Sequence, residues 1–181
     1  MYLTKRIYLG ANYKHNNVKG VITITKGEDN KPVKVDLSKV SYIEEEVAYW
    51  RKANHIHKWF VDNIQEGIDD CRDHYVSRED IQKLVDLCKQ VKETARSIDG
   101  QVWNGTTWTK AEGEVHNYEP GKVIVNQDEV EQLLPTVSGF FFGNTDYDEY
   151  YMKDIEDTIA QLEPLLAEED EHAEYQYQSS W

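Results

Sequence analysis

The sequence predicts an α+β fold with an N-terminal β-hairpin region, three substantial helices and a second small β-hairpin region between helices two and three. β-Branched residues and period-two alternation dominate the first forty residues, as in strands. Apolar residues recur at three- and four-residue intervals in three longer stretches, as on the buried face of a helix. We therefore expect a single α+β domain over residues 1–167, followed by an acidic, aromatic-punctuated tail over 168–181.

The N-terminal β region is predicted from two strand-like runs. Val21–Thr25 is β-branched throughout, and Val33–Leu37 alternates with period two. Residues 26–32 between them are rich in Gly, Asp, Asn and Pro, which favours a turn and therefore a hairpin. Residues 2–9 can supply a further strand.

The first helix is expected to begin at Ser41. Ser41 and Glu44 have the spacing of a capping box, in which the hydroxyl and the carboxylate each accept a hydrogen bond from a backbone N–H. Apolar and aromatic residues follow at helical spacing as far as Ile64, and Gly67 marks the end. This pattern predicts a helix of about 20 residues with one broad apolar face.

The second helix is expected to begin at Ser77, which also has an acidic residue three positions later, and to end near Ser97. Its predicted buried stripe consists of Ile81, Leu84, Val85, Cys88 and Val91.

A second β region follows the second helix. Asn104-Gly105 lies between two strand-like runs and favours a type I′ hairpin turn, because both central residues of that turn need a positive φ. Residues 119–122 predict another turn before a strand at 123–125. A short helix over 129–134 should stop at Pro135.

The last part of the chain combines an aromatic strand with the third helix. Ser138–Gly143 contains three consecutive Phe between glycines, which indicates a buried strand. A helix is expected from about Asp146, and Pro164 should kink or end it. The residues after it are expected to form the solvated tail.

Charge is distributed unevenly along the chain. Residues 146–181 contain twelve Asp or Glu and one Lys, a net charge of −11, whereas residues 1–40 carry +5 within a total of −14. This balance argues against direct binding to nucleic acid, which needs clustered Lys and Arg. No apolar run is long enough to span a bilayer and no signal-peptide pattern opens the chain, so we expect no membrane partner. The two cysteines form no disulfide framework and fit a reducing cytosol.

Three blocks of the sequence, taken together, resemble the sequences of a family of proteins. They are Val40–Asn54 continuing through Ile56–Val61, then Tyr75–Glu79, and then Gly139–Gly143 with Tyr147–Tyr151. Over most of residues 1–160 the chain resembles an uncharacterised family of small proteins encoded by bacteriophages and prophages. The resemblance implies a phage-derived protein in the cytosol of a bacterial host, where small acidic accessory proteins often neutralise defence systems or redirect host machinery.

The leading hypothesis is a non-enzymatic binding protein that inhibits or redirects a bacterial host protein, such as a defence protein or a basic nucleic-acid-binding protein. The concentrated acidic charge and the tyrosines beside it suggest the contact surface, because Tyr is favoured at interfaces. Carboxylates along a helix can also imitate the phosphates of duplex DNA. The candidate partner-binding residues are Tyr147, Asp148, Tyr150, Tyr151, Asp154, Glu156, Asp157 and Glu163.

A binder that sequesters a small ligand, such as a nucleotide signal, is the alternative. Polar residues interrupt the apolar face of the first predicted helix and could form the floor of a pocket, within one chain or across a homodimer. The competing interpretation of His57 is a buried, hydrogen-bonded core histidine. The candidate ligand-binding residues are Trp50, Arg51, Asn54, His57 and Lys58.

A metal-assisted hydrolase is a second alternative. Its residues would be His57, Asp69, Asp70 and His74. His55 and His57 cannot share one ion on a helix, because side chains two residues apart point about 200° apart. Cys71 and His74 have ligand-like spacing, but no second Cys/His pair completes a four-ligand zinc site, and nothing marks Cys71 as a nucleophile. We therefore predict no catalytic residues, no metal ligands and no cofactor.

Overall fold

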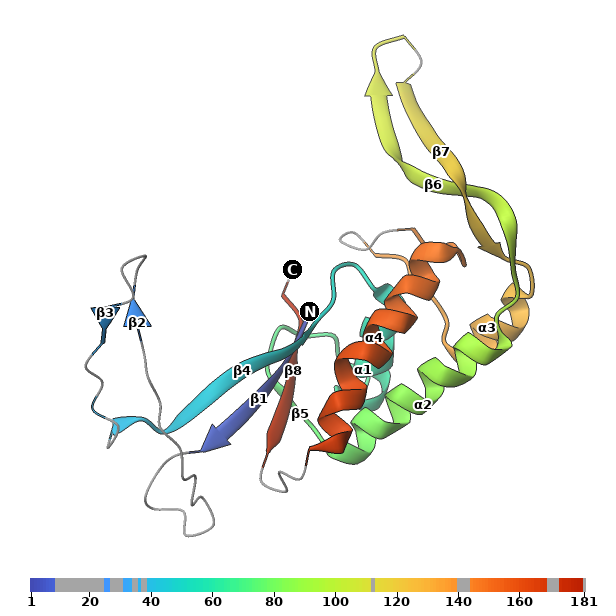
Figure 1. Cartoon of the computed structure of the whole chain (residues 1–181). Helices are drawn as coiled ribbons and strands as arrows, with labels where there is room; N and C mark the ends of the chain where they lie inside the picture. Colours follow the sequence, from blue (N-terminus) through green and yellow to red (C-terminus); the bar gives the residue numbers. More distant parts are fainter. Residues whose placement is uncertain are drawn as a thin grey trace.

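The structure, a computed structural model, confirms the α+β class. It describes residues 1–8, 25–26, 31–33, 36, 39–111, 113–139, 144–168 and 173–180. A four-stranded antiparallel sheet packs beside a group of helices, and a two-stranded ribbon projects from that group (Figure 1). None of the helices in these described ranges is both long and apolar enough to cross a membrane.

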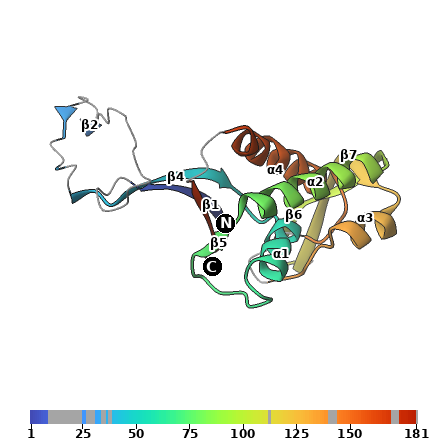
Figure 2. The same cartoon turned by 90° about the horizontal axis from the view of Figure 1, so that it is seen from below.

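The four-stranded sheet has the order β4–β1–β8–β5. β1 (Tyr2–Tyr8) pairs with both β4 (Tyr42–Tyr49) and β8 (Glu174–Gln178), and β8 also pairs with β5 (His74–Val76). In both views β1 and β4 run away from the helices, toward β2 (Figure 2). The predicted strand at the N-terminus is therefore present and lies inside the sheet.

Three helices form most of the remaining core. These are α1 (Asn54–Asn63), α2 (Arg78–Thr94) and α4 (Glu149–Ala167), and α4 packs along α2. A fourth, short helix is α3 (Gln127–Leu133), which ends before Pro135 as expected. Their apolar faces and the sheet share one cluster of buried side chains, so they form a single core.

The predicted N-terminal hairpin is present where the structure describes it. β2 (Thr25–Lys26) pairs with β3 (Lys31–Pro32) across the turn cluster. The rest of the two predicted strands, apart from Val33 and Asp36, lies outside the described residues.

The helix predicted from Ser41 is wrong over its first half, because Tyr42–Tyr49 forms β4. Glu44, which we expected to cap a helix, is opposite Arg6 of β1 and forms an ion pair with its guanidinium group. Opposite charges facing each other across strands stabilise a sheet, and this pairing with a distant segment overrides the local capping signal. The helix begins at Asn54 instead.

Asn104-Gly105 is not a hairpin turn, because it lies inside β6 (Ser97–Thr109). The strand register shifts between Trp103 and Thr106, and Gly105 has a φ of 96°. The glycine thus accommodates a positive φ in a β-bulge rather than in a turn.

The second β region is longer than predicted. β6 pairs with β7 (Gly113–Ile124), and the chain reverses between Thr109 and Gly113. The predicted turn at 119–122 lies within β7, where Pro120 is opposite Gln101. Pro is tolerated here because each strand of a two-stranded ribbon is an edge strand.

The C-terminal segment differs most from its interpretation as a solvated tail. Residues 174–178 form β8, which lies between β1 and β5 in the sheet. Tyr175 and Tyr177 alternate with polar residues and are 2% and 0% exposed. Period-two burial of large aromatic side chains makes β8 part of the core, so the domain does not end at residue 167.

Two details of the last helix also differ from expectation. α4 starts at Glu149 with Asp148 as its N-cap, and it continues past Pro164 to Ala167. Phe140–Gly143 of the predicted aromatic strand lies outside the described residues.

The start and the buried face of the second predicted helix are confirmed, but α2 ends at Thr94 and Ser97, the expected end, begins β6. Ser77 is the N-cap of α2, and its hydroxyl accepts a hydrogen bond from the backbone N–H of Asp80 at 3.1 Å. All five residues of the predicted stripe are buried.

Ser77→Ala and Ser41→Ala together test the two capping signals. We expect Ser77→Ala to lower the free energy of unfolding by about 1 kcal/mol, because it removes a true N-cap. Ser41→Ala should change it by less than about 0.5 kcal/mol, because Ser41 is an exposed residue that precedes a strand. Urea unfolding followed by circular dichroism measures both, and equal losses would contradict the assignment of β4.

Candidate functional site

A pocket lies where the starts of α1 and α4 meet the base of the β6–β7 ribbon. Its volume is about 540 Å³. Such a volume is within the range of about 300–1,000 Å³ that is typical of small-molecule sites. Its lining includes Arg51, Asn54, His55, Trp103, Tyr150 and Asp154.

The pocket brings together residues from both predicted binding sets. Arg51 and Asn54 come from the ligand-binding set, whereas Tyr150, Tyr151 and Asp154 come from the partner-binding set. Asn54 has a structural role here, because its amide accepts from the backbone N–H of Val137 and donates to the carbonyl of Asn144, both at 3.0 Å. These bonds hold the chain before α4 against the start of α1.

Arg51 and Lys52 are exposed cations at this pocket. Among the Lys and Arg side chains that the structure describes, all except Arg51, Lys52 and Lys110 bond to a carboxylate or a carbonyl. Lys52 also has a φ of 65°, a conformation that non-glycine residues rarely adopt and that concentrates at functional sites. In an acidic protein, two adjacent cations without partners provide a local positive patch.

His55 is the pocket residue whose role the sequence did not indicate. It is 2% exposed, and its Nε2 has no hydrogen-bond partner within the described chain. Its ring lies 4.3 Å from the ring of Tyr151, measured between centroids. Burial lowers the pKa of His55 to about 3, so the ring is neutral at physiological pH. No sequence signal distinguishes His55, because α4 is the element that buries it.

Three other predicted ligand-binding residues do not line the pocket. Trp50 is buried and donates from Nε1 to Thr158 Oγ1 at 2.8 Å. His57 is also buried; its Nδ1 shares a hydrogen bond with the hydroxyl of Tyr177 at 2.7 Å. Lys58 forms an ion pair with Asp62 one turn along α1. These contacts stabilise the fold, in agreement with the core interpretation of His57.

The residues proposed for metal-assisted hydrolysis are separated into two pairs. His57 Nε2 lies 3.2 Å from Asp69 Oδ2, and His74 Nε2 lies 2.7 Å from Asp70 Oδ1. Within the described ranges, no group of three or more His, Cys, Asp or Glu residues is arranged to hold a metal ion. The geometry therefore offers little support for this alternative.

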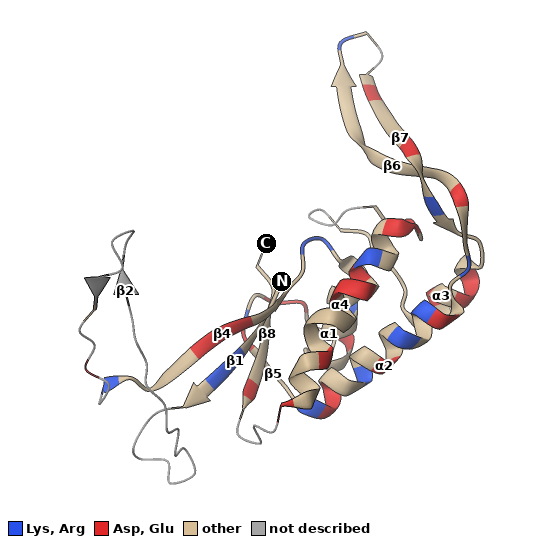
Figure 3. Ribbon diagram, in the orientation of Figure 1, with Lys and Arg blue, Asp and Glu red and all other residues tan. Residues whose placement is uncertain are grey.

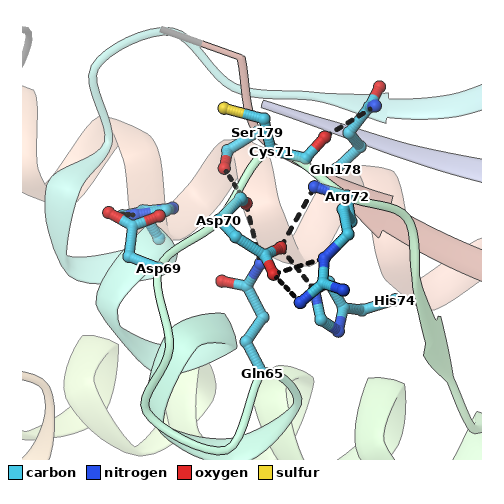
Figure 4. Close-up of polar contacts among 9 residues, drawn as sticks. Gln65, Asp69, Asp70, Cys71, Arg72, His74, Gln178 and Ser179 are labelled. Atoms are coloured by element: carbon cyan, nitrogen blue, oxygen red, sulfur yellow. Dashed lines mark hydrogen bonds and ion pairs between the residues drawn. The ribbon is translucent and has the colours of Figure 1, made fainter.

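The loop that contains these acids ties α1 to the end of β8 (Figure 4). Hydrogen bonds from His74 and Arg72 hold the pKa of Asp70 well below its usual range. The backbone carbonyl of Cys71 accepts from the amide of Gln178 at 3.0 Å. Polar contacts of this kind explain why acidic, basic and imidazole groups gather in this loop.

The predicted acidic and tyrosine-rich surface divides into buried and exposed parts. Tyr147 and Tyr151 are buried in the core, and Asp148 is the N-cap of α4. Tyr150 is 42% exposed, and its hydroxyl donates to Glu119 of β7 at 2.7 Å. This hydrogen bond connects the predicted surface to the ribbon.

The exposed acids of α4 are largely compensated by lysines. Glu156 pairs with Lys92, Glu163 pairs with Lys89, and Asp157 pairs with Lys153 of α4 itself. Figure 3 accordingly shows acidic and basic residues interspersed along α2 and α4. Because most of its acids are paired with lysines, this face supports imitation of DNA less well than the acidic sequence suggested.

Asp154 is the exception among these acids. It is half-buried at the pocket, and its carboxyl group takes part in no hydrogen bond within the described ranges. Burial, together with the neighbouring charge of Asp157, raises its pKa to about 7. Asp154 can therefore exchange a proton near neutral pH.

The outer part of the β6–β7 ribbon, beyond the residues of β6 that line the pocket, is exposed. The ribbon extends away from the helices and has no second layer along its outer part (Figure 1). Trp108 is 75% exposed and Tyr118 is 60% exposed, whereas the buried side chains Val102 and Ile124 lie in the part nearer the helices. The ribbon thus presents large aromatic side chains and two strand edges to its surroundings.

Comparisons with known proteins supply no further guide. No protein-family model matches the sequence, and no curated protein and no solved structure is similar to it. Function has to be inferred from the residues themselves.

Proposed function

We propose that this chain is a phage-derived, non-enzymatic binding protein that inhibits or redirects a bacterial host protein, such as a component of a defence system. The observation that carries this proposal is the projecting β6–β7 ribbon with exposed Trp108 and Tyr118. An isolated two-stranded ribbon is only marginally stable in water, and large exposed aromatic groups are typical anchors of protein interfaces. Docking onto a partner would stabilise the ribbon and bury these side chains.

The contact surface extends from the ribbon to the start of α4. Tyr150 bonds to Glu119 of β7, and the carboxylate of Glu149 accepts from the backbone N–H of Lys122 at 2.9 Å. Tyr150 therefore stands at one end of a continuous surface that includes the ribbon. This surface retains the exposed part of the predicted tyrosine-rich set and does not need the compensated acids farther along α4.

The expected partner is a protein with an apolar groove or an open sheet edge. Each strand of the ribbon has one edge that pairs with no other strand among the described residues, which allows a partner strand to be added by backbone hydrogen bonds. The ribbon carries few charged residues (Figure 3), so aromatic contacts rather than ion pairs would provide most of its affinity. The phage resemblance supports a host protein as the partner.

A shortened ribbon tests this proposal. We would remove residues 107–115 and join Thr106 to His116 through an Asn-Gly turn, since these two residues are opposite each other in the ribbon. Tagged full-length protein produced in a bacterial host should retain a stoichiometric partner, and the shortened variant should lose it. Circular dichroism would verify that the helices are unchanged.

A single substitution refines the same test. Trp108→Ser should weaken binding of the retained partner by about 30-fold, the effect of losing an interface anchor worth about 2 kcal/mol. Tyr75→Ser is the matched control, because Tyr75 is 63% exposed on β5, outside the ribbon. Failure to retain any host protein, or equal binding by the shortened ribbon, would refute the proposal.

A further inference from the structure

We propose that the pocket at the base of the ribbon binds a nucleoside phosphate, with the phosphate at Arg51 and Lys52 and the base between Trp103 and His55. This inference concerns a second binding site and does not rest on the role of the outer ribbon. The pocket lining combines exposed cations with aromatic and imidazole side chains.

The exposed cations of the pocket lining are suited to an anion. Arg51 and Lys52 are exposed, adjacent and without ion-pair partners in the described chain, whereas most other described cations are paired. Lys153, which also lines the pocket, is held by Asp157 at 2.7 Å. The two free cations are therefore the groups available to bind a phosphate.

The start of α1 adds to this positive charge. α1 is ten residues long, and it begins without a side-chain cap and without an acidic residue in its first turn. Its first backbone N–H groups carry partial positive charge and lack intrahelical partners, which is an arrangement that favours phosphate. Arg51 and Lys52 immediately precede the N-cap residue Ala53 in the sequence, and Lys52 has the positive φ noted above. The positive charge and the uncapped helix start thus both favour a phosphate group.

Other residues of the pocket lining are suited to a planar ring with a polar edge. Trp103 is half-buried in the wall, where its indole can stack on a nucleobase. His55 Nε2 is buried without a hydrogen-bond partner among the described residues, and leaving such an atom unpaired costs free energy that a ligand atom could recover. Asp154 adds a carboxyl group that can accept from, or donate to, the same ligand edge.

Together, the cations, Trp103 and His55 fit a nucleoside phosphate better than simpler ligands. Inorganic phosphate would use the cations but leave His55 unpaired, and an apolar ligand would use Trp103 but neither His55 nor the cations. A volume of about 540 Å³ leaves room for a base and a sugar as well as a phosphate. The acids Asp146 and Asp154 in the lining favour a ligand that brings hydrogen-bond donors with its negative charge.

Calorimetric titration of the full chain with nucleoside monophosphates tests the inference. AMP, GMP, CMP and UMP would each be titrated, with adenosine and inorganic phosphate as the two halves of the ligand. We expect at least one monophosphate to bind 10-fold or more tightly than inorganic phosphate and adenosine. Binding by none of the four would overturn the inference, and equal binding of phosphate alone would show a simple anion site.

Charge variants identify the phosphate end. Replacing Arg51 and Lys52 together with Gln should weaken the bound monophosphate by at least 10-fold, because both phosphate contacts are removed. Lys58→Gln is the matched control, since Lys58 lies on α1 outside the pocket and already pairs with Asp62. Unchanged affinity in the double variant would contradict the proposed position of the phosphate.

Nitrogen-15 NMR of the wild-type protein identifies the base end without any substitution. The Nε2 resonance of His55 should shift on addition of the monophosphate, because a new hydrogen bond changes its shielding. The Nε2 resonance of His57 should not shift, since His57 lies outside the pocket and bonds to Tyr177. A ligand that binds without moving the His55 resonance would place the base elsewhere.

Discussion

Tyr177→Ala is expected to lower the free energy of unfolding by about 3–5 kcal/mol, the range typical for truncating a buried aromatic side chain. Tyr177 is fully buried in β8, and its ring stacks on Phe60 with 3.9 Å between the centroids. Its hydroxyl also bonds to His57 at 2.7 Å. One substitution therefore removes contacts among the sheet, α1 and the loop beyond it. Chemical unfolding followed by tryptophan fluorescence and circular dichroism measures the loss.

Two further variants make this test specific. Tyr177→Phe keeps the ring but removes the hydrogen bond to His57, so it should cost about 1–3 kcal/mol. Tyr75→Ala truncates the same residue type at an exposed position on the neighbouring strand β5 and should cost less than about 1 kcal/mol. A mild effect of Tyr177→Ala, similar to that of Tyr75→Ala, would mean that the C-terminal segment is a solvated tail after all.

The second large effect is a loss of stability in mild acid that depends on His55. The folded state holds the pKa of His55 near 3, against an ordinary value of 6.5, because the ring is buried. As the pH falls below 6.5, the unfolded chain gains a proton that the folded protein does not. The contribution of His55 to the free energy of unfolding should therefore fall by about 1.4 kcal/mol per pH unit, or about 2 kcal/mol between pH 6.5 and 5.

His55→Phe isolates this contribution, because it keeps an aromatic ring and removes the titrating group. Its free energy of unfolding should fall less steeply than that of the wild type over the same interval, by about the 2 kcal/mol given above. The lowered pKa of His57 and the raised pKa of Asp154 act in opposite directions on stability, but both residues are present in the two proteins. His55→Gln provides a second comparison if the Phe variant is unstable, and parallel pH profiles in both variants would contradict a buried, neutral His55.

Segments whose structure depends on nearby residues were predictable. The stripe of α2 was correct at every position because helical spacing itself selects the buried face, and Ser77 caps the helix with a side chain three residues from its partner. The pairing of β2 with β3 was correct for a similar reason, since the Gly, Asp and Asn residues between them favour a turn locally.

Segments whose structure depends on distant residues were not predictable. Ser41 and Glu44 match a capping box as well as Ser77 and Asp80 do, but β1 supplies Arg6 opposite Glu44 and makes the segment a strand. Asn104-Gly105 matches a hairpin turn, but the longer pairing of β6 with β7 makes it a bulge. In both cases the local signal is real, and backbone pairing over many residues outweighs it.

The candidate site shows the same limit. Sequence spacing indicated Arg51 and Asn54 at one helix and Tyr150, Tyr151 and Asp154 about one hundred residues later, but it could not show that they line one pocket. Nor could it show that His55 is buried without a hydrogen-bond partner in the described structure, since α4 provides that burial.

The sequence by itself therefore determined the α+β class and the helix of the second apolar stripe, and it suggested residues for two candidate binding sets. Only the tertiary structure decided that the C-terminal segment is an inner strand, that the acids of α4 are matched by lysines, and that two distant sets share a pocket. The physical reason is that periodicity and capping act over a few residues, whereas strand pairing, burial and charge compensation depend on which distant segments the fold brings together.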